Sequence, residues 1–423
     1  MASIYGLAVI LIIFEGIIIQ CQQLIFPNNL IENFANDLNL KTDEFERFPQ
    51  QRKTDIIISK ILPDYIITIE QSEEDDRDDF YKGHGEDDSF LRICDHRKIM
   101  AFFKKYAGQV KKIDIAYSSK DDKVLHKEIN LNIIKACANH LEELRFECSF
   151  DGDEGFWEEI SEGKNDFKFP EVTKFQSLGP STRKEFDLKS IFPKLQKLRL
   201  SQTVADKNCM ANLESLEELW LDVSSIEEYK LDNVFAKNTK LNNIFLVEPQ
   251  RMETVESIAK HSTKLKTLGI DYPGEVFKTG RLSFDAPKPK KLILSNFSTI
   301  DQIINFIKCF KELEEVFIFF QRPYDLERIR ELQHIREIKI TIYEVKAESV
   351  IELIESFPAN CELQTLKFLY FLKWNTERHY KFQMNEIDSY LKKKKSTWTL
   401  SKDSNEPWTT GKNFVFKRKP CKK

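Results

Sequence analysis

FPKLQKLRLSQ, residues 192–202, places leucines at Leu195, Leu198 and Leu200. Gaps of three and then two residues match neither the 3.6-residue period of an amphipathic helix nor the strict alternation of a half-buried strand. The L-x-x-L-x-L pattern predicts a short strand whose last two leucines point to one side, with the first leucine packed where the strand begins. One such strand cannot bury its apolar side alone, so the pattern predicts stacked neighbours of the same kind.

This pattern recurs along most of the chain. Its copies lie on average about 25 residues apart, within the range of 20–29 residues that is typical of leucine-rich repeats. The step is 24 residues at each of the three intervals between Leu241 and Leu313. The first apolar residues of the eleven copies are Val110, Leu141, Val172, Leu195, Leu216, Leu241, Leu265, Pro289, Leu313, Ile335 and Leu363.

The segments between the copies have helical periodicity. Residues 299–310 place Ile300, Ile303 and Ile307 at helix spacing, and residues 348–357 and 252–261 follow the same rule. A strand followed by a helix, repeated along the chain, predicts an α/β fold. We therefore expect a leucine-rich-repeat solenoid, a curved horseshoe of about eleven irregular repeats with a C-terminal hairpin cap.

Leucine-rich repeats commonly carry an asparagine three residues after the third apolar position. In this chain that position is occupied by Thr203, Ser224, Pro249 and Pro273. The sequence therefore predicts that the usual ladder of buried amides is missing and that the curvature is irregular.

The ends of the chain do not follow the repeat. The sequence predicts an apolar segment at 1–21, a non-repeat region at 22–105, the repeats at 106–385, and a cap at 386–423. Within the second part, residues 70–88 carry ten acidic side chains and are expected to form a solvated loop. The cap contains the alternating runs STWTLSK and KNFVFKRK, which predict a hairpin that closes the last repeat and precedes a basic tail.

Charge and cysteine content narrow the classes of function. The formal net charge is only −4, which argues against nucleic acid as a partner. Eight cysteines are present without paired or zinc-finger spacing. Cys137 and Cys309 each stand four residues before a repeat, which predicts small buried apolar side chains. This use of cysteine is typical of reducing compartments and favours the cytoplasm or nucleus.

The N-terminus favours a different compartment. MASIYGLAVILIIFEGIIIQCQQ, residues 1–23, has a short apolar core followed by a polar stretch, as in a secretory signal. However, Glu15 interrupts the core, and no basic residue occurs before Lys41. The 14 residues 6–19 are shorter than a spanning helix needs. The segment is thus a signal or anchor, which would bring the chain to a membrane, or else a buried N-terminal helix or a wrongly assigned start.

Motifs for catalysis and metal binding are missing from the sequence. The seven histidines form no H-E-x-x-H or H-x-E pattern, and there is no G-x-S-x-G, Walker or G-x-G-x-x-G string. We therefore expect no catalytic residues, no metal ligands and no cofactor, and a protein that is not an enzyme.

The repeat register predicts a partner-binding surface. In each copy, the residue between the second and third apolar positions points away from the core, onto the concave face. Exposed apolar runs are unusual unless something covers them, and aromatic side chains are typical of interface hot spots. The predicted binding residues are Trp220, Phe245, Ile293, Phe317 and Phe319, with basic flanks at Lys339 and Lys367. Two alternatives stay open: that the C-terminal tail or residues 22–105 cover this face, or that the register slips by one residue.

Two adjoining stretches resemble a known family. IMAFFKKYAGQVKKIDIAYSS, residues 99–119, and LNIIKACANHLEELRF, residues 131–146, resemble the first repeats of insect F-box and leucine-rich-repeat proteins. Trp398 and NFVFKRK are similar to that family's closing hairpin, so the resemblance covers residues 98–420. The residues that carry the first part are Phe103, Gly108, Val110, Ile113, Ile115, Ile134, Cys137, Leu141 and Leu144.

The resemblance implies a substrate-recognition subunit of a cullin-based ubiquitin ligase. In such a subunit the F-box binds the ligase adaptor and the repeats bind the target protein. LPDYIITI, residues 62–69, is like the start of the first F-box helix. The acidic run follows it directly, where an F-box continues with an L-x-x-V-C-x-x-W-like segment.

Two functions are therefore expected from the sequence. The first is a protein–protein recognition scaffold in the cytoplasm or nucleus, with or without coupling to a ubiquitin ligase. The second is a secreted or membrane-tethered repeat protein that binds a ligand outside the cell. The second predicts cap disulfides and glycans, but the sequence has only one acceptor triplet, Asn296-Phe297-Ser298.

Overall fold

The fold comes from a computed structural model of the whole chain, which forms two compact units. Unit 1 holds residues 1–195 and 199–209, and unit 2 holds residues 196–198 and 210–423. The structure describes residues 26, 28–40, 43–62, 64–71, 80–84, 89–93, 96–117, 131–148, 168–177, 187–200, 209–224, 230–274, 289–319, 326–342, 347–358, 361–370, 377–394, 396–403 and 413–419. The apolar segment 1–21 lies outside these ranges.

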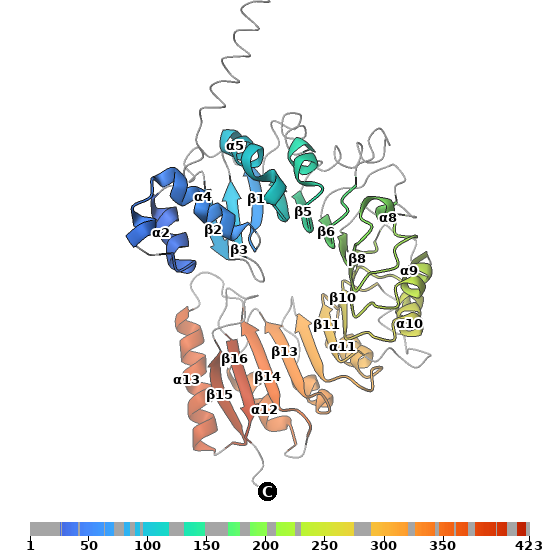
Figure 1. Ribbon diagram of the computed structural model, residues 1–423. Coiled ribbons are helices and arrows are strands. Elements are labelled where there is room, and N and C mark those ends of the chain that lie inside the picture. Colours follow the sequence, from blue (N-terminus) through green and yellow to red (C-terminus); the bar gives the residue numbers. More distant parts are fainter. Residues whose placement is uncertain are drawn as a thin grey trace, which may run out of the picture. The chain divides into compact units, whose positions relative to one another are not determined.

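Unit 1 combines N-terminal helices with a mostly parallel sheet (Figure 1). Its sheet has the order β2-β3-β1-β4-β5-β6, in which only β2 and β3 pair antiparallel. The helices are α2 (Asn28–Asp37), α3 (Asp43–Glu46), α4 (Gln50–Ile61), α5 (His96–Tyr106), the 3-10 turn η1 (Ala107–Gln109) and α8 (Leu188–Ile191). The strands are β1 (Ile66–Gln71), β2 (Phe80–His84), β3 (Ser89–Ile93), β4 (Lys112–Tyr117), β5 (Glu143–Cys148) and β6 (Lys174–Ser177).

The predicted start of an F-box helix at residues 62–69 is wrong. Residues 66–71 form strand β1, which pairs parallel to β4 with Ile67 opposite Ile113. The run Ile66, Ile67, Thr68 and Ile69 is β-branched throughout, and such side chains fit a pleated sheet better than a helix. The region before the repeats therefore contributes strands to the same sheet as the first repeat strand.

The acidic stretch 70–88 is also more ordered in part than a solvated loop. Its first two residues end β1, and residues 80–84 form strand β2 against β3. The acidic residues between these strands, at 72–79, and those at 85–88 lie outside the described ranges.

Unit 2 alternates strands with helices, and strand β7 (Lys197–Leu200) is divided between the two units, with residues 197 and 198 in unit 2. Its strands are β8 (Glu218–Asp222), β9 (Asn243–Val247), β10 (Thr267–Asp271), β11 (Lys291–Ser295), β12 (Glu315–Phe319), β13 (Glu337–Ile342), β14 (Thr365–Tyr370), β15 (Trp398–Asp403) and β16 (Asn413–Arg418). Its helices are α9 (Leu231–Lys237), α10 (Met252–His261), α11 (Ile300–Ile307), the 3-10 helix η4 (Leu326–Leu332), α12 (Ala347–Ser356) and α13 (Glu377–Lys393).

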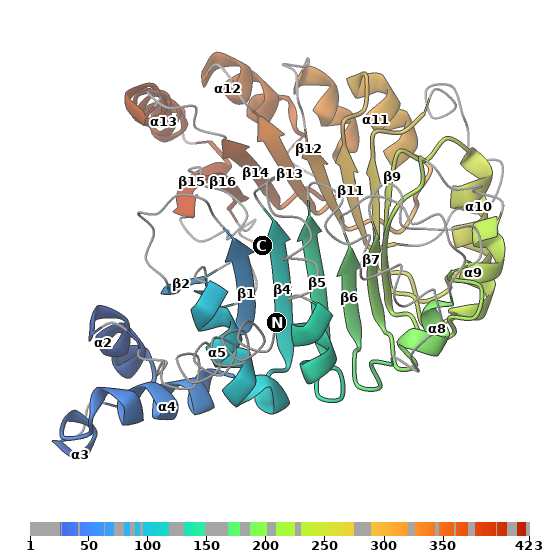
Figure 2. The ribbon, with the colours of Figure 1, turned by 90° about the horizontal axis from the view of Figure 1, so that it is seen from above.

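The sheet of unit 2 is parallel from β8 to β14 and ends in an antiparallel hairpin. Strand β16 pairs antiparallel with β14, and β15 pairs antiparallel with β16. This confirms the predicted C-terminal hairpin. Helices α9, α10, α11 and α12 lie along one face of the strands (Figures 1 and 2). We call the opposite face of β8–β14 the open face of unit 2.

Burial follows the repeat pattern throughout. The first, second and third apolar positions of all eleven copies are buried, including Pro289 and the polar Ser177. Helix α10 spans the predicted residues 252–261, and α11 and α12 lie within or close to their predicted ranges. The α/β fold with a mostly parallel, open sheet is therefore confirmed.

Three consecutive copies also share an uncommon turn. Glu248, Tyr272 and Asn296 directly follow β9, β10 and β11, stand 24 residues apart, and have positive φ angles of 55°, 46° and 57°. The N–H of Glu248 donates to the carbonyl of Asp271 at 2.8 Å, and the N–H of Tyr272 donates to that of Ser295 at 3.2 Å. The first two of these turns thus bond to the end of the next strand, which aligns β9, β10 and β11 without an asparagine ladder.

The cysteine predictions are half right. Cys137 is fully buried, and burial raises the pKa of its thiol to about 12, so it stays a protonated apolar side chain. Cys309 is half-buried instead, and its Sγ donates to the carbonyl of Asn305 at 3.3 Å. Within the described ranges, no helix combines the length and the apolar character needed to cross a membrane.

Candidate partner-binding face

The predicted binding residues form one continuous row on the open face of unit 2. Cross-strand pairing places Trp220 opposite Phe245, Phe245 opposite Gly269, and Gly269 opposite Ile293. The row continues through Phe317, Lys339 and Lys367, so no register slip occurs. Neighbouring strands lie about 4.8 Å apart, so the apolar part from Trp220 to Phe317 spans about 19 Å. Phe319 lies one row further along, opposite Ser295 and Thr341.

At the β8 end of the row, the rings of Trp220 and Phe245 are stacked. Trp220 and Phe245 have ring centroids 5.9 Å apart and planes that differ by 10°. A Cβ atom on Gly269 would lie 1.8 Å from Cδ2 of Phe245. The Phe245 ring therefore extends over Gly269, into the space that a side chain there would fill. The missing side chain on β10 therefore makes room for the ring of the neighbouring strand. Gly269 was not among the predicted binding residues, although an apolar row interrupted by one glycine is a signal of such a close approach.

The predicted basic flanks are not free cations. Lys339 Nζ lies 3.1 Å from Glu315 and 3.7 Å from Glu337, and Lys367 Nζ lies 3.4 Å from Glu337. Lys291 joins the same ladder, 3.1 Å from Glu315. Burial raises the pKa of Glu315, but the hydrogen bonds and positive charge of Lys291 and Lys339 outweigh it and hold this pKa below its usual value. Each of these lysines already has a carboxylate partner, so the ladder does not by itself demand an acidic partner.

The described part of the cap extends the sheet and does not cover this face. Val415 of β16 pairs with Lys367 of β14, so the hairpin continues the row sideways. All seven predicted residues are half-buried, since each lies between neighbours of its own row. Such a surface of large, partly exposed apolar side chains can bind an apolar partner segment without a costly rearrangement.

The described ranges were also compared with the geometry that metal ligands require. No three His, Cys, Asp or Glu side chains in them lie close enough together to hold a metal ion. On the helix side of unit 2, Ser257 Oγ donates to Asp232 Oδ1 at 2.7 Å, and His261 Nε2 lies 3.1 Å from the same oxygen. A carboxylate between a serine and a histidine leaves the histidine unable to activate that serine, so this cluster links α9 to α10.

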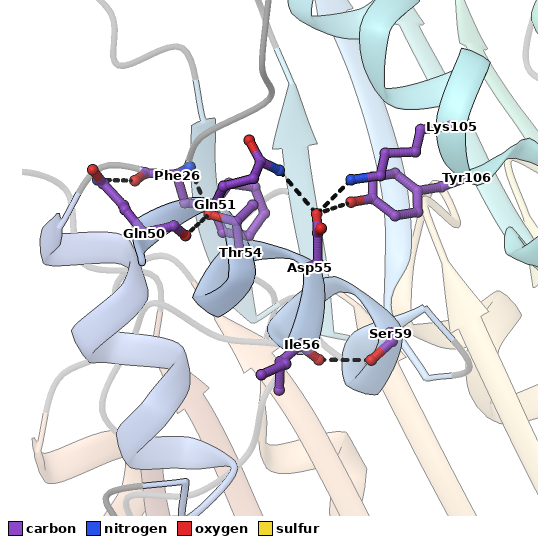
Figure 3. A network of polar contacts seen from close by, with 9 residues as sticks. All are labelled: Phe26, Gln50, Gln51, Thr54, Asp55, Ile56, Ser59, Lys105 and Tyr106. Atoms are coloured by element: carbon purple, nitrogen blue, oxygen red, sulfur yellow. Dashed lines mark hydrogen bonds and ion pairs between the residues drawn. The ribbon is translucent and has the colours of Figure 1, made fainter. Parts of the chain in front are cut away.

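A second polar cluster joins helix α4 to helix α5 in unit 1 (Figure 3). Asp55 Oδ1 on α4 accepts from Lys105 Nζ at 2.7 Å and Tyr106 Oη at 2.5 Å, both on α5, and from Gln51 Nε2 at 3.0 Å. Burial raises the pKa of Asp55, but these hydrogen bonds outweigh it, so the pKa lies below the ordinary 3.8. Burial and the bond to Asp55 raise the pKa of Tyr106. The cluster holds two helices together.

We expect Asp55→Asn to loosen the contact between α4 and α5 by about 1 kcal/mol at neutral pH, because charge-assisted hydrogen bonds become neutral ones. A carboxylate whose pKa is depressed by folding stabilises above its unfolded pKa of 3.8, and this contribution is lost as the pH falls through the lower folded value. Backbone hydrogen exchange in residues 50–61 and 96–106 should therefore be faster in the variant at neutral pH, with the difference shrinking below pH 3.8.

Glu46→Gln is the matched control for this prediction. It removes an exposed carboxylate that pairs with Lys53 at 3.0 Å, an interaction expected to contribute little. Equal exchange rates in the two variants would show that Asp55 does not join the helices.

No family model and no curated protein matches this chain.

Proposed function

We propose that the chain is a non-enzymatic protein–protein recognition scaffold. In this proposal the strands and helices are leucine-rich repeats of one solenoid, and the open face of unit 2 binds the partner. The observation that carries it is the register of one row across five parallel strands, which brings Trp220, Phe245, Ile293 and Phe317 together on the face opposite the helices. Phe319 belongs to the same surface, and Lys339 and Lys367 border it.

Trp220→Ala combined with Phe317→Ala should lower affinity for the protein partner at least tenfold, because large aromatic anchors contribute most of the energy of such interfaces. The matched control is Met252→Ala combined with Ile351→Ala, two half-buried apolar side chains on helices α10 and α12. The measurement is titration of a partner identified by cross-linking to the parent chain. Equal affinities for both double variants, with parental folding by circular dichroism, would rule out the open face.

Coupling to a cullin-based ubiquitin ligase is the more specific form of this proposal. It rests on the resemblance of residues 98–420 to insect F-box and leucine-rich-repeat proteins, and it leaves the adaptor-binding segment to be found, since residues 66–71 form a strand. Affinity purification of the tagged chain should then recover both the adaptor and the cullin. Their absence, alongside recovery of a partner that needs Trp220, would leave a scaffold without ligase coupling.

The apolar residues 1–21 favour a second candidate, a secreted or membrane-tethered repeat protein that binds a ligand outside the cell. The readout that separates the two is the mature N-terminus, which removal of a signal would place near residue 21 in protein recovered from the medium. Glycan is a poorer readout, because Asn296 Nδ2 of the acceptor triplet donates to Asp271 Oδ1 at 2.6 Å. An intact N-terminus in cytosolic protein would exclude this candidate.

A further inference from the structure

The open face of unit 2 divides into two parts of different charge. On β11–β14 the outward basic residues Lys291, Lys339 and Lys367 are paired with Glu315 and Glu337. On β8–β10 the outward positions include acids but no lysine or arginine. We call this second part the aromatic–acidic patch; its residues are Glu218, Trp220, Asp222, Asn243, Phe245, Val247, Thr267, Gly269 and Asp271.

Asp222 is the unusual member of the patch. It is only 5 % exposed, and its Oδ1 accepts from the backbone N–H of Ser224 at 3.0 Å. Among the described residues, no lysine, arginine or histidine pairs with it. Burying a carboxylate is costly unless a cation or several donors compensate it. Glu218, by contrast, lies 3.4 Å from Lys197 and already has a cation.

Asp271 lies in the same row as Asp222, with Val247 between them. Two strand spacings separate the two aspartates, about 10 Å. Phe245 precedes Val247 by two residues on β9, about 7 Å along the strand, and therefore points to the same face. A positive group above Val247 would thus lie between the two acids and beside the aromatic pair.

We propose that the aromatic–acidic patch binds a lysine or arginine side chain within an otherwise apolar segment of the protein partner. This inference rests on the proposed function. The negative faces of the Trp220 and Phe245 rings attract a cation, and desolvation beside them strengthens that attraction. Asp222 and Asp271 supply the opposite charge. The apolar residues Ile293 and Phe317 then bind the neighbouring part of the same segment.

The test selects peptides that bind the full chain from a displayed library of random peptides. Peptides that also bind the Trp220→Ala, Phe317→Ala double variant are then removed. The remaining peptides should carry a lysine or arginine next to apolar residues. Replacing that residue by norleucine in the synthetic peptide should weaken binding about tenfold. Asp222→Asn should have a similar effect, because asparagine can still accept from Ser224 but carries no charge.

Glu253→Gln on helix α10 changes the net charge equally, away from the face, and should leave affinity within about twofold. Circular dichroism checks folding; should Asp222→Asn fail to fold, Asp271→Asn takes its place. The cation assignment would be wrong if peptides that need Trp220 bound equally well with norleucine in place of the basic residue. It would also be wrong if they bound the aspartate variant as tightly as the parent chain. Either result would leave the proposed function standing. Selection of no peptide that needs Trp220 and Phe317 would overturn both.

Discussion

Asn238→Ala is expected to lower the free energy of unfolding of unit 2 by about 3 kcal/mol. Asn238 follows helix α9 and is completely buried. Its Oδ1 accepts from the N–H of Leu216 at 2.8 Å, and its Nδ2 donates to the carbonyl of Leu213 at 2.9 Å. Both partners lie in the segment that leads into strand β8, so this one amide ties the end of helix α9 to that segment.

The size of the effect follows from what the substitution leaves behind. The carbonyl of Val234, the third partner, keeps the backbone N–H of Asn238 at 3.1 Å. The N–H of Leu216 and the carbonyl of Leu213 instead lose the amide that bonds to them, and each buried polar group left unpaired costs about 1–3 kcal/mol. Urea unfolding followed by tryptophan fluorescence measures the loss, since four of the five tryptophans belong to unit 2.

Ser262→Ala provides the matched control. Ser262 stands 24 residues after Asn238, at the end of the next helix, and is also buried. Its Oγ has no hydrogen-bond partner among the described residues. Its removal should change stability by less than about 0.5 kcal/mol. Similar losses for both substitutions would show that the position matters for packing and that the amide contacts do not.

The second large effect is expected at Gly269. Gly269→Ala should destabilise unit 2 by about 2 kcal/mol, because the new Cβ would collide with a packed ring. It would lie 1.8 Å from Cδ2, 2.3 Å from Cε2 and 2.7 Å from Cγ of Phe245, so the whole ring would have to leave its place beside Trp220. Partner affinity should fall with it, since the stacked pair forms one end of the binding row.

A double-mutant cycle separates this collision from other effects of the alanine. In a Phe245→Ala background the ring is gone, and Gly269→Ala should be neutral or stabilise by about 0.5 kcal/mol, as alanine restricts the unfolded strand more than glycine does. Urea unfolding of the four proteins gives the coupling energy. The same cost for Gly269→Ala in both backgrounds would mean that Phe245 does not depend on the glycine.

Asn238 and Gly269 also show which features of the structure sequence patterns can and cannot predict. The burial of the repeat positions, helix α10 at residues 252–261 and the C-terminal hairpin were predictable, because periodicity reports directly which side chains need a common core. Asn238 was not predicted, since its amide bonds to backbone groups more than twenty residues earlier, and a buried asparagine leaves no periodic signal. The strand at residues 66–71 was mistaken for a helix because a short apolar run is ambiguous without its partner strand.

The repeat pattern is enough to tell which of its residues are buried, and therefore which strand positions face outward as a row from Trp220 to Lys367. The reason is that a strand alternates its two sides regardless of what surrounds it. The packing and the charge of that row depend on contacts between strands, which the pattern does not contain. Pairing between strands placed Phe245 over Gly269 and set Glu315 and Glu337 beside the lysines, which turned predicted basic flanks into ion-paired side chains. It also left Asp222 buried without a cation among the described residues, because charge balance depends on neighbours that lie far apart in the chain.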